Sequence, residues 1–342
     1  MKKVFLSDTK KITFADVEKP AAVANKVLIK TKATGICGTD VHSYYGETIF
    51  GKMFPFHLGH EVAGIVEAVG PDCTNIQVGD HVVIDPTIAC GVCDSCRAGK
   101  ANHCRHMTTI GRTGPGGFSD YILTPEPSVY RFDPKLDYET AALAEPLACV
   151  MHGIERANIK LGDKVLVKGI GSIGQMHMLV AKENGAAVVA VTDFNREKLA
   201  RAEKLGADYA VFAGNKDFDE QMHAIAPDGF DVVIDCTGAP ASVATAVPYV
   251  RNAGTLLIFG VCPKDAKVEF SPHEIYIREL SIVGSFAFPK ETLTKSLAFL
   301  SAGRITAEQM ISAVLPRDQL SQAIEDVSAG KYDGKVIIST EK

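Results

Sequence analysis

Short apolar runs separated by glycine and proline dominate the first 145 residues of the chain. Residues 26–30, 62–66 and 81–84 are such runs, rich in valine, leucine and isoleucine. β-Branched residues in short runs bounded by turn-forming residues are typical of strands, and a succession of short strands favours an antiparallel sheet or barrel. We therefore expect residues 1–145 to form a mostly antiparallel, barrel-like lobe.

The pattern changes at about residue 146, where apolar runs begin to alternate with helical periodicity. The strand-type runs are 164–167, 188–191, 209–212, 231–235 and 255–259, and the first helical segments are 175–184 and 196–205. Strands that alternate with helices predict a parallel sheet with helices on its faces. We therefore expect residues 146–289 to form an α/β domain with a doubly wound parallel sheet of the Rossmann type.

The C-terminal segment departs from this alternation. Helical stretches at 290–302 and 317–329 precede a final strand-type run at 335–338. A chain of 342 residues exceeds what one hydrophobic core usually supports, so two domains are expected. We assign residues 290–342 to the first lobe, which gives one domain of 1–145 with 290–342 and a second domain of 146–289.

The composition excludes several classes of protein. Apolar residues make up 46% of the chain and charged residues 23%, as in ordinary soluble domains. The net charge of -5 argues against a nucleic-acid-binding surface, and no apolar run is long enough to cross a membrane. No apolar region of a secretory signal follows Met1, so the nine cysteines are expected to be thiols or metal ligands in a cytoplasmic protein.

Four closely spaced cysteines predict a structural zinc site. They follow the pattern C-x2-C-x2-C-x7-C and are Cys90, Cys93, Cys96 and Cys104. Four thiolates this close can converge on one tetrahedral Zn²⁺, which closes the site to substrate. We expect a zinc lobe over about residues 86–108. A zinc-ribbon module that binds nucleic acid is an alternative, opposed by the acidic net charge.

A glycine-rich turn predicts dinucleotide binding in the second domain. Gly169-Ile170-Gly171-Ser172-Ile173-Gly174 follows a strand-type run and precedes a helix. The glycines permit a tight turn and close backbone approach, and the helix N-terminus favours a pyrophosphate.

An acidic residue after the next strand bears on the choice of dinucleotide. Asp193 is placed to accept hydrogen bonds from a ribose diol, which favours NAD over NADP. Its alternative role is to cap the next helix, and the nearby Arg196 and Lys198 leave NADP open.

A second, open metal site is predicted in the first domain. Cys37 and His60 are the natural first pair of ligands, and Glu61, Glu145 or both in exchange would supply oxygen. A catalytic zinc takes three protein ligands and keeps one position for water or substrate. The alternatives are a buried thiol with a core histidine, and hence a zinc-free reductase or a non-catalytic zinc- or NAD-binding protein.

These motifs, in this order, resemble those of the zinc-containing medium-chain dehydrogenases/reductases. The shared motifs are Cys37-x-Thr39-Asp40-x-His42, Gly59-His60-Glu61-x2-Gly64, Val78-Gly79-Asp80, the four cysteines, Gly116-Gly117-Phe118, the glycine turn and Cys236-Thr237-Gly238. The resemblance implies a GroES-like β-barrel catalytic domain plus a Rossmann domain. It also implies two Zn²⁺ per chain, one catalytic and one structural, with NAD as the hydride acceptor.

Within this family, Ala144-Glu145-Pro146-Leu147-Ala148 resembles the polyol (sorbitol-type) branch. The stretch Gly284-Ser285-Phe286-Ala287-Phe288 lacks the arginine that the sorbitol-type enzymes carry, which argues against sorbitol itself. Butanediol, inositols, sugar acids and polyol phosphates stay open as substrates. L-Threonine dehydrogenases are ranked lower, because they usually carry a Gly-Asn-Ala-Val-His stretch near this position, which this chain lacks.

The resemblance implies roles for further residues. Thr39 would begin a proton route from the substrate hydroxyl, and His42 would pass the proton to water. A surface histidine at a helix start is the alternative for His42. The additional candidates for cofactor contacts are Lys198, Val261 and Ser285. The expected partner is a small alcohol or ketone, and relatives are commonly homo-oligomers, dimers or tetramers.

Aromatic and basic residues near the open site are candidates for substrate contacts. They are Tyr44, Tyr45, His57 and Phe118, and Lys52 could bind a phosphate or carboxylate. Packing is the alternative for the aromatic residues, and a solvated surface position is the alternative for the lysine.

Overall fold

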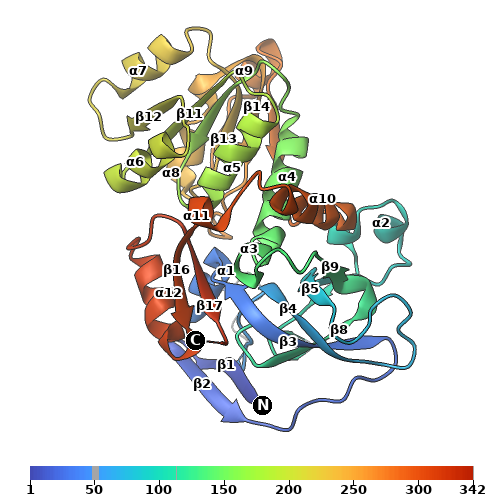
Figure 1. The fold of residues 1–342 in the computed structure, drawn as a ribbon. Coiled ribbons are helices and arrows are strands. Elements are labelled where there is room, and N and C mark those ends of the chain that lie inside the picture. Colours follow the sequence, from blue (N-terminus) through green and yellow to red (C-terminus); the bar gives the residue numbers. More distant parts are fainter. Residues whose placement is uncertain (48–53, 113, 342) are drawn as a thin grey trace. The chain divides into compact units, whose positions relative to one another are not determined.

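The computed structural model describes residues 1–47, 54–112 and 114–341. The chain divides into two compact units (Figure 1). Unit 1 comprises Met1–Ala148 and Phe288–Lys342, and unit 2 comprises Cys149–Ala287. In the described part of the chain, no helix has the length and apolar character that crossing a membrane requires.

Unit 1 is built around a seven-stranded, mostly antiparallel sheet with the strand order β16-β17-β3-β4-β5-β9, in which β8 also pairs with β3. The strands of this sheet are β3 (Lys26–Gly35), β4 (Glu61–Val69), β5 (His81–Ile84), β8 (Tyr121–Pro125), β9 (Val129–Arg131), β16 (Ile311–Pro316) and β17 (Lys335–Ser339). A separate hairpin of β1 (Lys2–Asp8) and β2 (Lys11–Asp16) precedes it. The antiparallel lobe expected from the short apolar runs is therefore present.

The C-terminal segment completes the sheet of unit 1. Strand β17 pairs antiparallel with β3, with Ile337 opposite Gly35. The apolar run Val336-Ile337-Ile338 is buried there, which favours this position for the strand. The helices of unit 1 are α1 (Gly38–Tyr44), α2 (Asp94–Arg97), α3 (Tyr138–Ala141), α10 (Lys290–Ser301), α11 (Ala307–Met310) and α12 (Leu320–Ser328). Helix α4 (Ala144–Ala157) begins in this unit. The helix expected at 317–329 starts later, because residues 317–319 form a 3₁₀ turn.

The cysteine-rich segment is closed at its base by a short ladder. Strands β6 (Thr87–Ile88) and β7 (Thr108–Thr109) pair antiparallel, and the four cysteines and α2 lie between them in the chain. The two ends of this lobe are therefore held together, which fixes where the intervening loop begins and ends.

Unit 2 contains a six-stranded parallel sheet in the order β12-β11-β10-β13-β14-β15. Its strands are β10 (Lys164–Lys168), β11 (Val188–Asp193), β12 (Tyr209–Phe212), β13 (Phe230–Asp235), β14 (Val250–Ile258) and β15 (Ser281–Gly284), and its helices are α5 (Ser172–Glu183), α6 (Arg196–Lys204), α7 (Phe218–Ile225), α8 (Pro240–Ala244) and α9 (Pro272–Ile277). Val165, Leu166 and Val167 are all fully buried, so both faces of β10 are covered, as in parallel sheets with helices on their faces. This strand order reverses between β10 and β13, as in a doubly wound dinucleotide fold.

Candidate functional site

The open metal cluster forms where β3 and β4 lie side by side. Cys37 is the N-cap of α1, just after β3, and His60 and Glu61 stand at the start of β4. The antiparallel pairing sets Gly35 opposite Glu61. As a result, one ligand atom each from Cys37, His60 and Glu61 lie within 4.8 Å of one another. Sulfur, imidazole and carboxylate within this distance are donors that a zinc ion accepts.

Asp40 connects the two loops that carry these donors. Its Oδ2 accepts a hydrogen bond from the Cys37 backbone N–H at 2.9 Å, and its Oδ1 accepts one from the Gly59 N–H, also at 2.9 Å. Burial raises the pKa of this carboxyl, although His60 and both backbone N–H groups oppose the shift. The sequence motif around Cys37 predicts no separate role for Asp40. Its position three residues after Cys37, as N3 of a capping box, is the signal that could have indicated it.

Lys335 contributes a positive charge to the cluster from the far end of the chain. Its Nζ forms an ion pair with Oε1 of Glu61, and the two side chains are 3% and 0% exposed. The other carboxylate oxygen, Glu61 Oε2, is buried and has no hydrogen-bond partner among the described residues. Lys335 is not predictable from the sequence, because no motif links a lysine in the last strand to a glutamate 274 residues earlier.

Glu145 brings a further carboxyl near the cluster from the first turn of α4. Burial raises its pKa to about 7, and the neighbouring Glu61 adds to this shift while His60 opposes it. Burial lowers the pKa of His60, but Cys37, Asp40 and Glu145 outweigh burial and raise it well above its ordinary value. The cluster thus favours positive charge. Together with the unpartnered Glu61 oxygen and the donor set, this fits a catalytic zinc ion.

The four cysteines come together as expected for a structural zinc site. The Sγ–Sγ distances are 3.5 Å from Cys93 to Cys96, 3.9 Å from Cys93 to Cys104 and 4.0 Å from Cys90 to Cys96. Tetrahedral zinc with ordinary Zn–S bonds places its sulfurs about 3.8 Å apart. Backbone N–H groups directed at the sulfur lower the pKa of Cys93 to about 6, which favours the thiolate form that zinc binds. The cysteine cluster therefore fits structural zinc.

Thr39 and His42 lie on one helix, α1. Thr39 Oγ1 is 3.7 Å from the Cys37 sulfur, so its hydroxyl borders the metal cluster. His42 is in the last turn of α1 and not at its start, and its ring is 53% exposed, with Nδ1 3.5 Å from a carboxylate oxygen of Glu47. Residues three apart on a helix share a face. The two side chains thus extend from the cluster toward solvent.

The aromatic candidates for substrate contacts separate into two groups. Tyr44 and Phe118 are buried in the core of unit 1, and the Tyr44 hydroxyl donates a hydrogen bond to Glu325 at 2.9 Å. The side chains of Tyr44 and Phe118 are thus part of the packed core, which agrees with packing as the alternative to a substrate contact.

Tyr45 and His57 are partly exposed, so they stay candidates. A nitrogen of His57 lies 3.4 Å from the Val4 carbonyl oxygen. Lys52 lies outside the described residues.

The glycine turn between β10 and α5 has the geometry that its sequence predicted. Gly169 has a φ of +86°, a conformation that favours glycine. A Cβ on Gly174 would overlap the Gly169 carbonyl, whereas a Cβ on Gly171 would meet no described atom within 4 Å. Gly171 is also the N-cap of α5, so its free space lies at the helix N-terminus. Ile173, in the first turn of α5, is partly buried.

Asp193 ends β11 and contacts the glycine turn. Its Oδ2 accepts from the Ile170 N–H and its Oδ1 from the Asn195 N–H, both at 2.8 Å. Asn195, and not Asp193, caps α6, because its side chain accepts from the N–H groups of Glu197 and Lys198. The capping alternative for Asp193 is therefore wrong. The carboxylate instead lies beside the turn that precedes α5.

The other cofactor candidates occupy loops and helix starts of unit 2. Lys198 lies in the first turns of α6, and Val261 is well exposed after β14. Ser285 follows β15, and its hydroxyl is buried without a hydrogen-bond partner in the part of unit 2 that the structure describes. Arg196 is engaged elsewhere, because its guanidinium stacks 3.8 Å from the centre of the Phe212 ring.

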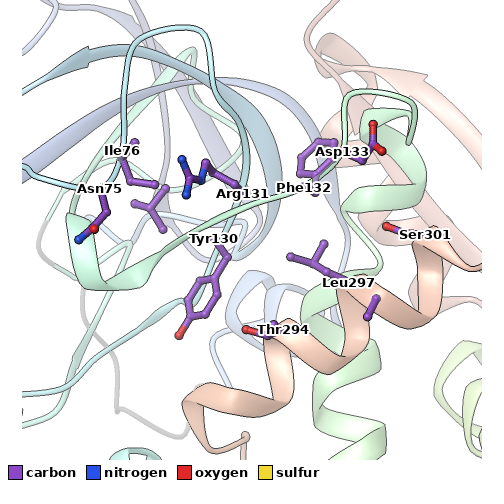
Figure 2. Close-up of a pocket in the computed structure, with 11 residues that line it drawn as sticks. Asn75, Ile76, Tyr130, Arg131, Phe132, Asp133, Thr294, Leu297 and Ser301 are labelled. Atoms are coloured by element: carbon purple, nitrogen blue, oxygen red, sulfur yellow. The ribbon is translucent and has the colours of Figure 1, made fainter.

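A separate cavity of about 490 Å³ lies in unit 1 between β9 and α10. Figure 2 shows the side chains of Tyr130 and Arg131 on the strand side and those of Thr294 and Leu297 on the helix side. None of the metal, cofactor or substrate candidates is among the described residues that line it. It is therefore distinct from the metal cluster.

Comparison with known proteins places both units. Residues 23–134 match the alcohol dehydrogenase GroES-like domain, and residues 172–302 match the zinc-binding dehydrogenase model. D-altritol 5-dehydrogenase of Agrobacterium fabrum is 36% identical over 86% of each chain. D-arabitol-phosphate dehydrogenase of Enterococcus avium is 33% identical over 96% of this chain and 94% of its own.

Solved structures agree with these matches. A zinc-binding dehydrogenase from Sinorhizobium meliloti, bound to NADP, superposes with a TM-score of 0.92 at 34% identity, covering 99% of this chain and 98% of its own. The expected fold class, a GroES-like lobe plus a Rossmann sheet, is confirmed. The chain therefore belongs to the zinc-binding dehydrogenases, the zinc-containing medium-chain dehydrogenase/reductase family, and its similarity to polyol dehydrogenases places it in their branch.

Proposed function

We propose that this protein oxidises a secondary alcohol of a polyol or sugar-derived substrate with NAD as the hydride acceptor. The observation that carries the proposal is the cluster of Cys37, His60 and Glu61, in which a buried carboxylate oxygen lacks a partner among the described residues. A cluster with three donors leaves room for a substrate oxygen, unlike the closed four-cysteine site.

In this proposal unit 1 is the catalytic domain and unit 2 the dinucleotide-binding domain. Zinc in the open cluster would supply Lewis acidity that favours loss of the substrate's hydroxyl proton, and NAD would accept the hydride. Cys37, His60 and Glu61 would hold the ion, with Glu145 as the exchanging carboxyl. Thr39 would receive the proton at its hydroxyl, and the exposed ring of His42 would release it to water.

The choice of substrate class rests on two observations. The similar proteins from Agrobacterium fabrum and Enterococcus avium act, by their names, on D-altritol and D-arabitol phosphate. Gly284–Phe288 lacks an arginine, which argues against sorbitol itself. L-Threonine and 2,3-butanediol are the rival substrates, and a direct screen separates them.

The test is an NAD-reduction screen over polyols, inositols, sugar acids and their phosphates, with L-threonine and 2,3-butanediol included. We expect the highest kcat/KM on a polyol or a sugar derivative. His60→Ala should abolish this oxidation while the Kd for NAD stays near normal, because His60 lies in unit 1 and the glycine turn in unit 2. His223→Ala, on the exposed side of α7, is the matched control. Full activity of His60→Ala would refute the metal assignment.

The oligomeric state and the cellular location of the protein are further parts of the proposal. We propose a cytoplasmic homodimer or homotetramer. No disulfide joins the described cysteines, which supports a reducing compartment. Light scattering on the purified protein tests the oligomeric state.

A further inference from the structure

Three strands converge at the place where Glu61 begins β4. Glu61 lies opposite Gly35 on one side of β3, and β17, which starts at Lys335, pairs with the other side of β3. A Cβ on Gly35 would overlap Glu61 Oε2 and would lie 3.1 Å from Lys335 Cε. The side chains of Glu61 and Lys335 therefore meet over Gly35, from the strands on either side of it.

The two oxygens of the Glu61 carboxylate have different surroundings. Oε1 is paired with the Lys335 ammonium, whereas Oε2 is buried and has no hydrogen-bond partner in the described residues. An unpaired buried carboxylate oxygen is costly unless a cation completes it. Gly35 provides the space that Oε2 occupies, so the position of this oxygen depends on both neighbouring strands.

The charges of the cluster give Lys335 a second effect. The Cys37 thiolate, Glu61 and Glu145 carry three negative charges when ionised, and a divalent ion together with the Lys335 ammonium balances them. Without the lysine, Glu61 Oε1 would lose the cation with which it is paired, and a bound ion would meet less competition for the carboxylate. A carboxylate with no competing cation is a stronger ligand.

We propose that Lys335 is a positioning residue that limits Glu61 to a weak, one-oxygen ligand of the catalytic metal. The lysine holds Oε1 and leaves Oε2 for the ion, so a coordination position stays available to substrate. This inference rests on the proposed function, because it assumes that the cluster of Cys37, His60 and Glu61 binds zinc.

The test compares zinc affinity in the wild type, Lys335→Met, Glu61→Gln and the double variant. The affinity is measured by competition with a chromogenic chelator, and His60→Ala gives the background from the four-cysteine site. Lys335→Met should bind the second zinc ion at least about tenfold more tightly, while kcat falls because Glu61 competes with substrate. General damage to the fold would weaken metal binding, so a gain in affinity separates positioning from a structural role.

The double variant keeps the inference falsifiable if Lys335→Met folds poorly without metal. Glu61→Gln removes the unpaired buried charge, so Lys335→Met/Glu61→Gln should fold and bind zinc within about threefold of Glu61→Gln alone. Lys331→Met, which removes an exposed lysine paired with Asp326, is the matched control and should change neither value.

The outcomes separate this inference from the proposed function. A wild-type protein that holds one zinc ion per chain overturns both. Two ions with unchanged or weaker zinc affinity in Lys335→Met overturn the role of Lys335 alone. An affinity gain that persists undiminished in the Glu61→Gln background also overturns it, because the effect would then not pass through Glu61.

Discussion

Asp85, just after β5, is a carboxyl group that folding removes almost completely from water. Its side chain accepts a hydrogen bond from the Thr87 N–H at 2.8 Å, and the residue is 2% exposed. Burial raises its pKa to about 6, although Thr87 and the charge of Lys290 oppose the shift. The protonated form is therefore favoured in the folded state relative to the unfolded chain.

This shift predicts a pH-dependent loss of stability. Because the pKa of Asp85 is raised in the folded state, protonation of Asp85 stabilises the fold. This contribution to the free energy of unfolding is complete below the ordinary aspartate pKa and disappears as the pH rises through about 6. The change in the free energy of unfolding caused by Asp85→Asn should therefore be more favourable at pH 8 than at pH 3, by on the order of 3 kcal/mol. Urea unfolding across this range measures it. Equal effects of the substitution at both pH values would contradict the assignment.

Asp193 predicts the cofactor preference. Its carboxylate lies beside the glycine turn, where a ribose diol would donate to it and a 2′-phosphate would be repelled. Asp193→Asn keeps an acceptor for the Ile170 N–H but loses the charge. The ratio of the Kd for NADP to that for NAD should fall at least about tenfold in this variant, as measured by calorimetry.

Asp208→Asn is the control for this change. Asp208 accepts from the Val189 N–H near the start of β11, at the other end of that strand from Asp193. It should leave the ratio unchanged. A ratio that does not move in Asp193→Asn would remove the role of this carboxylate in cofactor choice.

The metal-ligating residues of the site could be predicted from the sequence better than the residues that hold them in position. Cys37, His60 and the four cysteines could be identified because their residue types and spacing are those of zinc ligands. Lys335 could not be identified in this way, because it reaches Glu61 only through the pairing of β17 with β3, two strands that lie far apart in the sequence. The hydrogen bonds of Asp40 depend on the loop before His60, and no residue pattern specifies that loop.

At the scale of elements, the glycines of the turn from β10 to α5 have two different roles: one allows close packing, and the other leaves space for a ligand. Gly174 packs against the Gly169 carbonyl, so it allows the helix to approach the strand closely. Gly171 faces open space in the described structure, so packing alone does not require glycine there. The free space at a helix N-terminus fits a pyrophosphate, which needs the backbone to be unobstructed.

Two alanine substitutions test this division. Gly174→Ala should lower the free energy of unfolding by about 2 kcal/mol or more, because its Cβ overlaps backbone. Gly171→Ala should leave stability nearly unchanged but weaken NAD binding at least about tenfold. Thermal unfolding and calorimetry measure the two effects. Normal NAD affinity in Gly171→Ala would mean that the pyrophosphate does not bind at this turn.

At the scale of the whole molecule, each unit has its own hydrophobic core. One core is formed by residues of the parallel sheet and its helices, such as Leu166, Val233 and Leu256. A separate core in unit 1 includes Leu6, Leu58 and Ile338. The period of the apolar pattern predicted both kinds of sheet, because strand alternation and helix repeats are local properties. The pairing of β17 with β3 is long-range: the change of pattern near residue 290 predicts only that residues 290–342 belong to the first lobe, not which strand they pair with.

Separate cores imply that each ligand stabilises mainly the unit that binds it. Zinc removal by a chelator should increase amide exchange most in unit 1, around the four cysteines and the start of β4, because closed zinc sites contribute to folding. NAD at about one hundred times its Kd should slow exchange that requires unfolding of unit 2 by roughly a hundredfold. Peptide-resolved hydrogen exchange measures both. Gly171→Ala should lose the NAD effect and keep the zinc effect, whereas NAD protection that is strongest in the four-cysteine lobe would contradict the assignment of the dinucleotide to unit 2.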